Sequence, residues 1–350
     1  MSTSMSTPTS TPMKLSVIVP CRNEAAHIDA FVASVLAQRL PAGTTLEVVV
    51  ADGRSDDGTR ARLEALAAAD ARLRWVDNPQ RITPTALNRA LGAASGEIVL
   101  RMDVHTTYAD DYIAQCVAAL EGTGATCVGG PWRTAAATGR AGAIAAAFGS
   151  RFGSGGAASR RLDYSGEVDT VYLGAWRRAE LLRFGGFDEA LVRNQDDELA
   201  LRIVRGGGRV WQSAAIRSWY VPRGSFTELF RQFWQYGYWK VAVLRKHRLP
   251  ASPRHLVPFA FVAALVALAL AAPWWPPAAW ALAALLASYA LAALGAAAAV
   301  APPWRQPARW LGVAWALGCM HFGYGLGFAR GLADHLLRRR AGAHATTLTR

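Results

Sequence analysis

The stretch Val99-Leu100-Arg101-Met102-Asp103-Val104-His105 begins as a short apolar run and ends in a carboxylate and an imidazole two residues apart. Side chains at i and i+2 of a strand point to the same face, so Asp103 and His105 are expected together at a strand end. Such a pair can hold a divalent cation against a phosphate, whose oxygens complete the coordination shell. The same residues also occur by chance in solvated turns, so the neighbouring motifs must decide.

Two earlier apolar runs also end in polar loops. Residues 15–20 (LSVIVP) and 46–51 (LEVVVA) are rich in β-branched side chains and predict buried strands. Residues 25–38 between them have helical periodicity. The second strand leads into residues 52–59 (DGRSDDGT), for which a turn followed by a capped helix is the alternative. This order of elements predicts a parallel sheet that binds ligands at the carboxyl ends of its strands.

Two further strands are expected at residues 74–76 and 97–102, with a helix over residues 84–94 between them. The polar loops that follow the strong strands would then converge on one rim of the sheet. Gly-x-Gly-x-x-Gly does not follow the first strand, which argues against a dinucleotide-binding oxidoreductase.

Charge and hydrophobicity divide the chain near Leu249. Residues 1–201 carry a formal charge of −3, whereas residues 202–350 carry +16. A basic half suggests nucleic acid, but these arginines flank three uncharged segments long enough to cross a hydrocarbon core of ~30 Å. The three segments are residues 256–272, 278–301 and 310–329. A membrane is therefore the expected partner, and nucleic acid is not, because anionic cytoplasmic headgroups attract juxtamembrane arginines.

The N-terminus and the cysteines indicate a compartment. Residues 1–13 are mostly Ser, Thr and Pro without an apolar core, so we expect a disordered lead and no signal peptide. The four cysteines have no paired spacing and are expected to be reduced. Both observations place the first half of the chain in the cytoplasm.

Four motifs stand in the order and spacing of a known family: VIVPCRNE (17–24), DGRSDDGT (52–59), RMDVH (101–105) and NQDDELALR (194–202). Over residues 14–223 the chain resembles family 2 glycosyltransferases of the GT-A fold. The segments NQDDE (194–198), RQ (231–232) and HFGYG (321–325) are similar to the membrane-associated succinoglycan-biosynthesis type. The resemblance implies an α/β fold: a Rossmann-like, mostly parallel GT-A domain followed by a C-terminal helical membrane region.

The resemblance also implies a nucleotide-diphosphate-sugar donor, with a UDP-sugar as the first choice. Its binding residues would be Pro20, Arg22, Glu24, Asp52, Arg81 and Asp103. Pro20 and Glu24 have plainer interpretations, a strand stop and an acid at a helix start, and Arg81 could be an ordinary surface residue. Asp103 and His105 would replace the usual Asp-x-Asp metal pair. An imidazole is a poorer ligand for Mg²⁺ than for Mn²⁺, so the identity of the cation, Mn²⁺ or Mg²⁺, stays open.

The family pattern places the catalytic base on Asp196, because the acid pair falls on Gln195 and Asp196. Capping of a helix start is the alternative for this acidic group. The acceptor would be bound by Gly174, Asp197 and Glu198. For Gly174, whose missing side chain lets a sugar approach the backbone, a tight strand packed against Trp176 is equally open.

Residues 225–254 form the expected interfacial region, rich in aromatic and basic side chains; an aromatic helix packed in a core is the alternative. Residues 255–337 would cross the membrane two or three times, and residues 338–350 form a basic tail. Three spans would place the arginines 338–340 on the side of the membrane opposite the cytoplasm, against the positive-inside bias. Either the last segment is re-entrant, or this protein is an exception to that bias. Gly323, Gly325, Gly327 and Gly331 permit close helix packing or a broken helix.

The expected protein is an inverting glycosyltransferase of the inner membrane that faces the cytoplasm. It would transfer sugar to a polyprenyl-linked saccharide in bacterial exopolysaccharide or cell-surface glycan assembly. Addition of a single sugar is expected, because residues 232–236 (QFWQY) lack the Gln-x-x-Arg-Trp of processive synthases. Direct transfer to polyprenyl phosphate is the runner-up. A transporter or channel with a cytosolic domain is less well supported, since His321 is the only ionisable residue within the three apolar segments.

Overall fold

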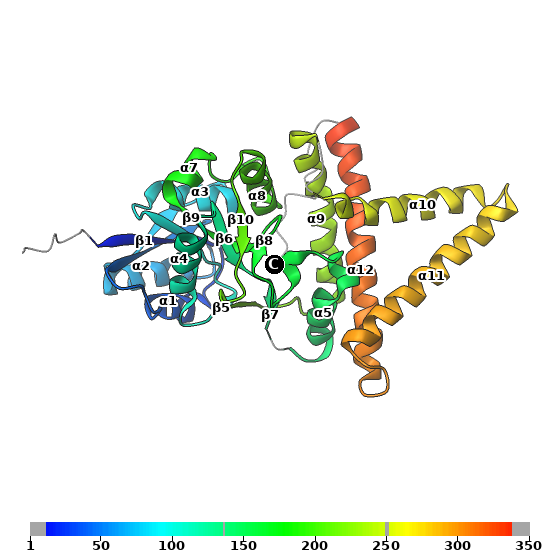
Figure 1. Ribbon diagram of the computed structural model, residues 1–350, viewed down its shortest axis with the longest axis horizontal. Coiled ribbons are helices and arrows are strands. Elements are labelled where there is room, and N and C mark those ends of the chain that lie inside the picture. The colour runs from blue at the N-terminus through cyan, green and yellow to red at the C-terminus, as the bar shows by residue number, and fades with distance from the viewer. Residues whose placement is uncertain (1–11, 136, 249–251, 338–350) are drawn as a thin grey trace, which may run out of the picture.

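The computed structural model describes residues 12–135, 137–248 and 252–337, which form an α/β domain and a helical region (Figure 1). Most of the lead expected at residues 1–13, and the basic tail at 338–350 with the arginines 338–340, lie outside the described residues.

The main sheet of the described chain has the strand order β3-β2-β1-β4-β9-β6-β10-β8. The strands are β1 (Met13–Cys21), β2 (Thr44–Asp52), β3 (Leu73–Asp77), β4 (Ile98–Arg101), β6 (Cys127–Gly130), β8 (Gly166–Glu167), β9 (Tyr172–Arg177) and β10 (Val210–Gln212). Strands β1 to β4 pair in parallel, as do β6 and β10, whereas β9 runs antiparallel between β4 and β6. The expected parallel sheet is confirmed, with β9 as an antiparallel insertion.

Both faces of the sheet are covered by helices. On one face α1 (Ile28–Leu36), α2 (Thr59–Ala69) and α4 (Tyr112–Thr123) pack against Val17 and Val19. On the other face α3 (Thr83–Ala93), α7 (Arg178–Arg183) and α8 (Gln195–Arg205) pack against Ile18 and Val49. Because both faces are buried, β1 and β2 are continuous apolar runs rather than alternating ones.

A smaller layer joins this domain to the helical region. Its three-stranded sheet has the order β5-β11-β7, with β5 (Thr106–Tyr108), β7 (Arg133–Thr134) and β11 (Ser218–Tyr220). Beside it lie α5 (Gly139–Gly149), α6 (Arg151–Ser154) and a 3₁₀ turn η1 (Ala158–Arg160). Residues of α5 and α6 pack on the last helix of the chain through Phe148, Phe152 and Leu317.

The helical region consists of α9 (Phe226–His247), a 3₁₀ turn η2 (Pro253–His255), α10 (Val257–Ala271), α11 (Pro276–Val300), α12 (Pro307–Leu332) and a π-helical turn η3 (Ala333–Leu337). Figure 1 shows α9 and α12 side by side, with α10 leading away from them and α11 returning. By length and composition, three described helical stretches could cross a membrane: Pro253–Ala271, Pro276–Val300 and Pro307–His335.

Glycines bring α9 and α12 into close contact. A Cβ on Gly323 would lie 2.7 Å from the Phe230 carbonyl oxygen, and one on Gly331 would lie 2.6 Å from that of Tyr238. Gly327 faces the Trp234 carbonyl in the same way. Since α12 runs unbroken through these residues, their role is close helix packing rather than a helix break.

The other glycine of this group and the aromatic side chains of α9 have separate partners. Gly325 faces α10, where its Cβ would lie 2.5 Å from the Pro258 carbonyl oxygen. Tyr238 and Trp239 of α9 are buried in a cluster with residues of α8. These two aromatic side chains therefore pack in the protein interior, as in the alternative in which α9 is an aromatic helix packed in a core.

Candidate active site

A cleft of about 2050 Å³ lies at the carboxyl ends of β1 and β4. It reaches from the loop after β1 to the N-terminus of α8, and from there to side chains of α10, α11 and α12. Among the predicted site residues, the cleft is lined by Pro20, Arg22, Glu24, Arg81, Asp103, His105, Asp196 and Asp197. The sheet thus brings together residues that are up to 177 positions apart, from Pro20 to Asp197.

The loop after β1 is held by the loop after β2. The Asn23 amide donates to Ser55 Oγ at 2.8 Å, and the Glu24 amide donates to Thr59 Oγ1 at 2.6 Å. Asn23 adopts a left-handed backbone, with φ of 55°, which an Asn tolerates better than most residues. These contacts, and the termination of β1, set the positions of Arg22 and Glu24 at the rim.

Asp52 is not brought to the cleft. Its carboxylate is fully buried, accepts a hydrogen bond from Ser55 Oγ and pairs with Arg60 at 2.9 Å. The residue therefore fixes the loop after β2, and its neighbour Gly53 lines the cleft instead. In this structure the Asp52 side chain does not line the cleft, and its contact with the nucleoside stays a prediction.

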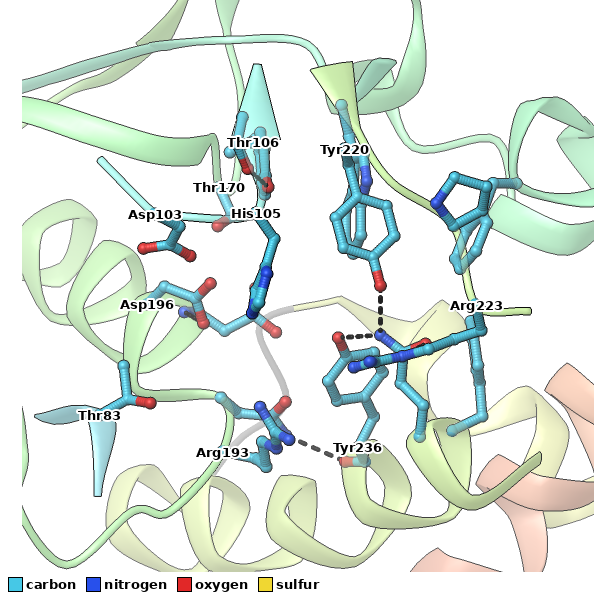
Figure 2. Close-up of a pocket in the computed structure, with 18 of the residues that line it drawn as sticks. Thr83, Asp103, His105, Thr106, Thr170, Arg193, Asp196, Tyr220, Arg223 and Tyr236 are labelled. Atoms are coloured by element: carbon cyan, nitrogen blue, oxygen red, sulfur yellow. Dashed lines mark hydrogen bonds between the residues drawn. The ribbon is translucent and has the colours of Figure 1, made fainter. Parts of the chain in front are cut away.

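Asp103 and His105 follow β4 rather than lie on it, because the strand ends at Arg101. The turn is fixed by Tyr108, whose hydroxyl accepts from the Asp103 amide at 2.7 Å and donates to the Asp103 carbonyl at 3.0 Å. Arg101 holds the Asp103 carboxylate with two hydrogen bonds of 3.0 and 2.9 Å. His105 Nε2 lies 2.8 Å from Glu24 Oε1. A turn, not a strand, thus carries both side chains to the cleft (Figure 2).

The three acids at the start of α8 have three different environments. Asp196 lines the cleft, where burial and then the charge of Asp197 raise the pKa of its carboxyl. Asp197 is half-buried, with 31% of its side chain exposed. The Lys240 ammonium that donates to it outweighs the effect of burial and lowers its pKa. A carboxylate with a raised pKa is the better proton acceptor near neutral pH, so the environment distinguishes Asp196 from its neighbour.

Glu198 points away from the cleft. Its carboxylate is fully buried and is bound by Arg202 at 2.6 Å, Lys246 at 2.8 Å and His247 at 2.9 Å. These hydrogen bonds outweigh burial and lower the pKa of Glu198 to about 2. The residue ties α8 to the end of α9 and does not line the cleft, and acceptor binding by Glu198 stays a prediction.

Gly174 also lies outside the cleft lining. Its φ is 114°, and a Cβ there would meet the Trp176 ring. The glycine is thus required by the packing of Trp176, which is the alternative stated for it. Arg177 and Arg178 lie at the far end of β9 from Tyr172, the residue of that strand that lines the cleft.

Several cleft residues were not found from the sequence. Arg101 is part of the RMDVH motif but was given no role there, and it is within electrostatic reach of both Asp103 and Asp196. Across the cleft from these acids lie Tyr220, Arg223 and Tyr236, with Arg193 near Asp196 (Figure 2). They come from three segments without a motif in common, so no local pattern could have grouped them.

The residues present fit a cation that is shared with a ligand. No cluster of three or more His, Cys, Asp or Glu side chains suited to a metal occurs in the described part of the chain. Asp103 and His105 could supply two ligands, an oxygen and a nitrogen, of the kinds that Mn²⁺ accepts. The oxygens of a bound diphosphate would have to supply most of the others.

A mostly parallel sheet with an Asp-x-His turn after β4 and an acid at the start of α8 defines a glycosyltransferase of the GT-A class. The fold is similar to that of the mannosyltransferase PcManGT from Pyrobaculum calidifontis, solved with GDP-Man and Mn²⁺: the TM-score is 0.60 at 25% identity, covering 93% of this chain and 89% of that one. S. aureus TarS 1–349, solved with UDP-GlcNAc, gives a TM-score of 0.50 at 17% identity, covering 94% and 93% of the two chains.

Residues 16–180 match the model of glycosyl transferase family 2. The chain is 34% identical over 247 residues to the succinoglycan biosynthesis protein ExoA of Rhizobium meliloti, which covers 70% of this chain and 74% of that protein. It is 31% identical over 123 residues to the glycosyltransferase AglE of Haloferax volcanii, covering 35% and 40% of the two chains. The chain belongs to glycosyl transferase family 2.

Proposed function

We propose that this glycosyltransferase inverts the anomeric centre as it moves one sugar from a nucleotide diphosphate to a saccharide linked to a membrane lipid. The observation that carries the proposal is the extent of the cleft. One cavity joins Arg22, Arg81 and Asp103 to Asp196 and continues to side chains of α10, α11 and α12. A soluble donor and a lipid-borne acceptor can therefore meet at Asp196.

In this mechanism Asp196 accepts the proton of the acceptor hydroxyl while that oxygen attacks the anomeric carbon. The bond from that carbon to the diphosphate breaks, and the nucleoside diphosphate leaves with the electron pair. Arg22 and Arg81 would stabilise the departing charge. Mn²⁺ or Mg²⁺, when held by Asp103 and His105, would supply further positive charge there.

The proposed location is supported by the apolar helices. Trp274 and Trp275 are exposed at the turn between α10 and α11, Trp280 is exposed near the start of α11, and Trp304 is exposed between α11 and α12. Exposed tryptophans near both ends of apolar helices suit the two interfaces of a bilayer. We place these helices in the inner membrane and the α/β domain on its cytoplasmic side, where nucleotide sugars are found.

The test is a panel of UDP-, GDP- and other nucleotide sugars, given to the purified full-length protein in lipid with and without Mn²⁺. Transfer to a lipid-linked saccharide, with inversion at the anomeric carbon by NMR, is the expected result. Transfer to polyprenyl phosphate alone would support the runner-up. Retention of the anomeric configuration, or no transfer from any donor, would contradict the proposal.

A further inference from the structure

Three arginines from separate segments line the membrane side of the cleft: Arg160 in η1, Arg193 before α8 and Arg223 before α9. Two of them are oriented by neutral amides. Arg193 Nε donates to Gln235 Oε1 at 3.2 Å, and Arg223 Nε donates to Gln232 Oε1 at 3.3 Å. In both contacts the acceptor is the neutral oxygen of a glutamine amide.

Arg160 is the least compensated of the three. Its guanidinium carbon lies 3.9 Å from the centroid of the Trp132 ring, and its Nη1 is buried without a hydrogen-bond partner in the described part of the chain. Arg160 also has no salt bridge there, whereas Lys240 and Arg254 nearby pair with Asp197 and Asp169. Arg160 is half-buried, but its Nη1 is withdrawn from water. A charged group removed from water without a counter-ion is destabilised, so the site favours an anion.

Repulsion among the arginines also favours a bound anion. Burial, and after it the charge of Arg223, lower the pKa of Arg193, and burial lowers the pKa of Arg160 to about 10. A guanidinium remains positively charged in proteins. Like charges held close together in a partly dry site repel each other, and a bound anion would relieve that repulsion.

Two tyrosines complete a set of hydrogen-bond donors. The Gln232 amide nitrogen donates to Tyr236 Oη at 2.9 Å and to Tyr220 Oη at 3.4 Å. Because both hydroxyls accept from this one amide, both keep their own proton for another acceptor. Figure 2 shows Arg193, Tyr220, Arg223 and Tyr236 around one part of the cleft, whose lining also includes Arg160. Such a set suits a ligand with several acceptor oxygens, such as a phosphate group.

The cleft becomes apolar beyond these residues. Its lining there includes Phe152 of α6, Phe261 of α10 and Tyr289 of α11. Two of these helices are among those long and apolar enough to cross a membrane. A ligand that fills both parts has an anionic head and a hydrocarbon tail.

We infer that Arg160, Arg193 and Arg223, with Tyr220 and Tyr236, bind the phosphate or diphosphate head of an anionic lipid whose chain lies toward α10 and α11. This inference deepens the proposed function and rests on it. It assigns these arginines to the acceptor and leaves the donor diphosphate to Arg22, Arg81 and Asp103. The two anion sites are then filled at the same time.

The probe is geranylgeranyl diphosphate, titrated into the full-length protein in neutral detergent with tryptophan fluorescence as the signal. We expect it to bind equally well with and without saturating UDP or GDP. Geranylgeraniol lacks the charge and inorganic diphosphate lacks the chain, so each should bind at least about tenfold more weakly. Equal binding of geranylgeraniol would overturn the role of charge, and equal binding of inorganic diphosphate would overturn the lipid.

Variants assign the residues. Arg160→Gln and Arg193→Gln should each weaken lipid binding by about tenfold, while nucleotide affinity stays unchanged and Arg193→Lys recovers part of the loss. Arg161→Gln is the matched control, because its side chain is 61% exposed and pairs only loosely with Asp163, at 3.8 Å. Thermal unfolding curves identify any variant that fails to fold. If Arg193→Gln is such a variant, Arg193→Lys is compared with the wild-type protein instead.

Two outcomes would assign the arginines to the donor and overturn the inference: competition between the lipid and the nucleotide, or loss of nucleotide affinity in the glutamine variants. The proposed function fails in a different way. If no nucleotide sugar supports transfer while the lipid still binds through these arginines, the enzymatic proposal is wrong and the lipid site stands.

Discussion

Lys240 of α9 donates a hydrogen bond to the carboxylate of Asp197, one residue after Asp196 on α8. The ammonium is buried, and only 5% of its side chain is exposed. A second contact joins the same helices, because Asn194 Nδ2 donates to the Tyr236 carbonyl at 2.9 Å. The helix that carries the candidate base is therefore positioned by the helix that packs on α12.

This arrangement separates the roles of the two neighbouring acids. Asp196→Asn should fold and bind the donor but lower turnover by about a hundredfold or more, because the proton acceptor is lost. Asp197→Asn, the matched control, should keep most of the turnover and lose stability, since it leaves the Lys240 charge buried without its partner. Steady-state rates and thermal unfolding of both variants check this. A dead Asp197→Asn beside an active Asp196→Asn would show that the base has been placed one residue too early.

The pH profile should report the environment of Asp196. The base must be deprotonated, so activity falls as the pH drops through its pKa. Burial and the charge of Asp197 raise that pKa, so the acidic limb should lie above the value of about 3.9 for an ordinary Asp. Asp197→Asn removes the neighbouring negative charge and should shift the limb to lower pH. A limb that does not move in this variant would contradict the assignment.

Metal dependence is expected to pass through the turn after β4. Asp103→Ala should abolish transfer, and excess chelator should do the same to the wild-type protein, with recovery on addition of Mn²⁺. His105→Ala should weaken the apparent affinity for the metal more than it lowers turnover at saturating metal, because Asp103 and the diphosphate would still hold the ion. Full activity in excess chelator would exclude this role of the pair.

Glu198 is expected to be structural. Its pKa is lowered to about 2, so its contribution to stability is complete above its unfolded-state pKa of about 4.3 and is lost as the pH falls toward 2. Glu198→Gln should reduce the free energy of unfolding by about 3 to 5 kcal/mol, because the cations that surround it lose their counter-ion. Unfolding followed by tryptophan fluorescence at pH 7 measures the loss. A large increase in the acceptor KM without loss of stability would instead support acceptor binding.

The contact between α9 and α12 can be tested through its glycines. Gly327→Val places a side chain against the Trp234 carbonyl, so the melting temperature should fall and α9 should shift relative to α12. Gly318→Val in the same helix is the control, because nothing lies within 4 Å of a Cβ there. Similar melting temperatures for the two variants would show that the helices are not held by this close approach.

The sequence by itself determined the elements and their order. The apolar runs at residues 15–20 and 46–51 became β1 and β2, because burial on both faces of a parallel sheet leaves a continuous hydrophobic pattern. The three long apolar segments became α10, α11 and α12, since helix length and hydropathy are local properties. The family also followed from motifs, which are short and contiguous.

Only the tertiary structure decided what each polar side chain faces. Asp196, Asp197 and Glu198 are consecutive, yet successive residues of a helix point about 100° apart, so each has a different partner. Asp52 and Gly174 were expected to bind ligands because of their places in the motifs. In the structure Asp52 holds the loop after β2, and Gly174 leaves room for the Trp176 ring. The arginines at 160, 193 and 223 converge only because η1 and the loops before α8 and α9 meet at one cleft, a contact between distant segments that no local pattern encodes.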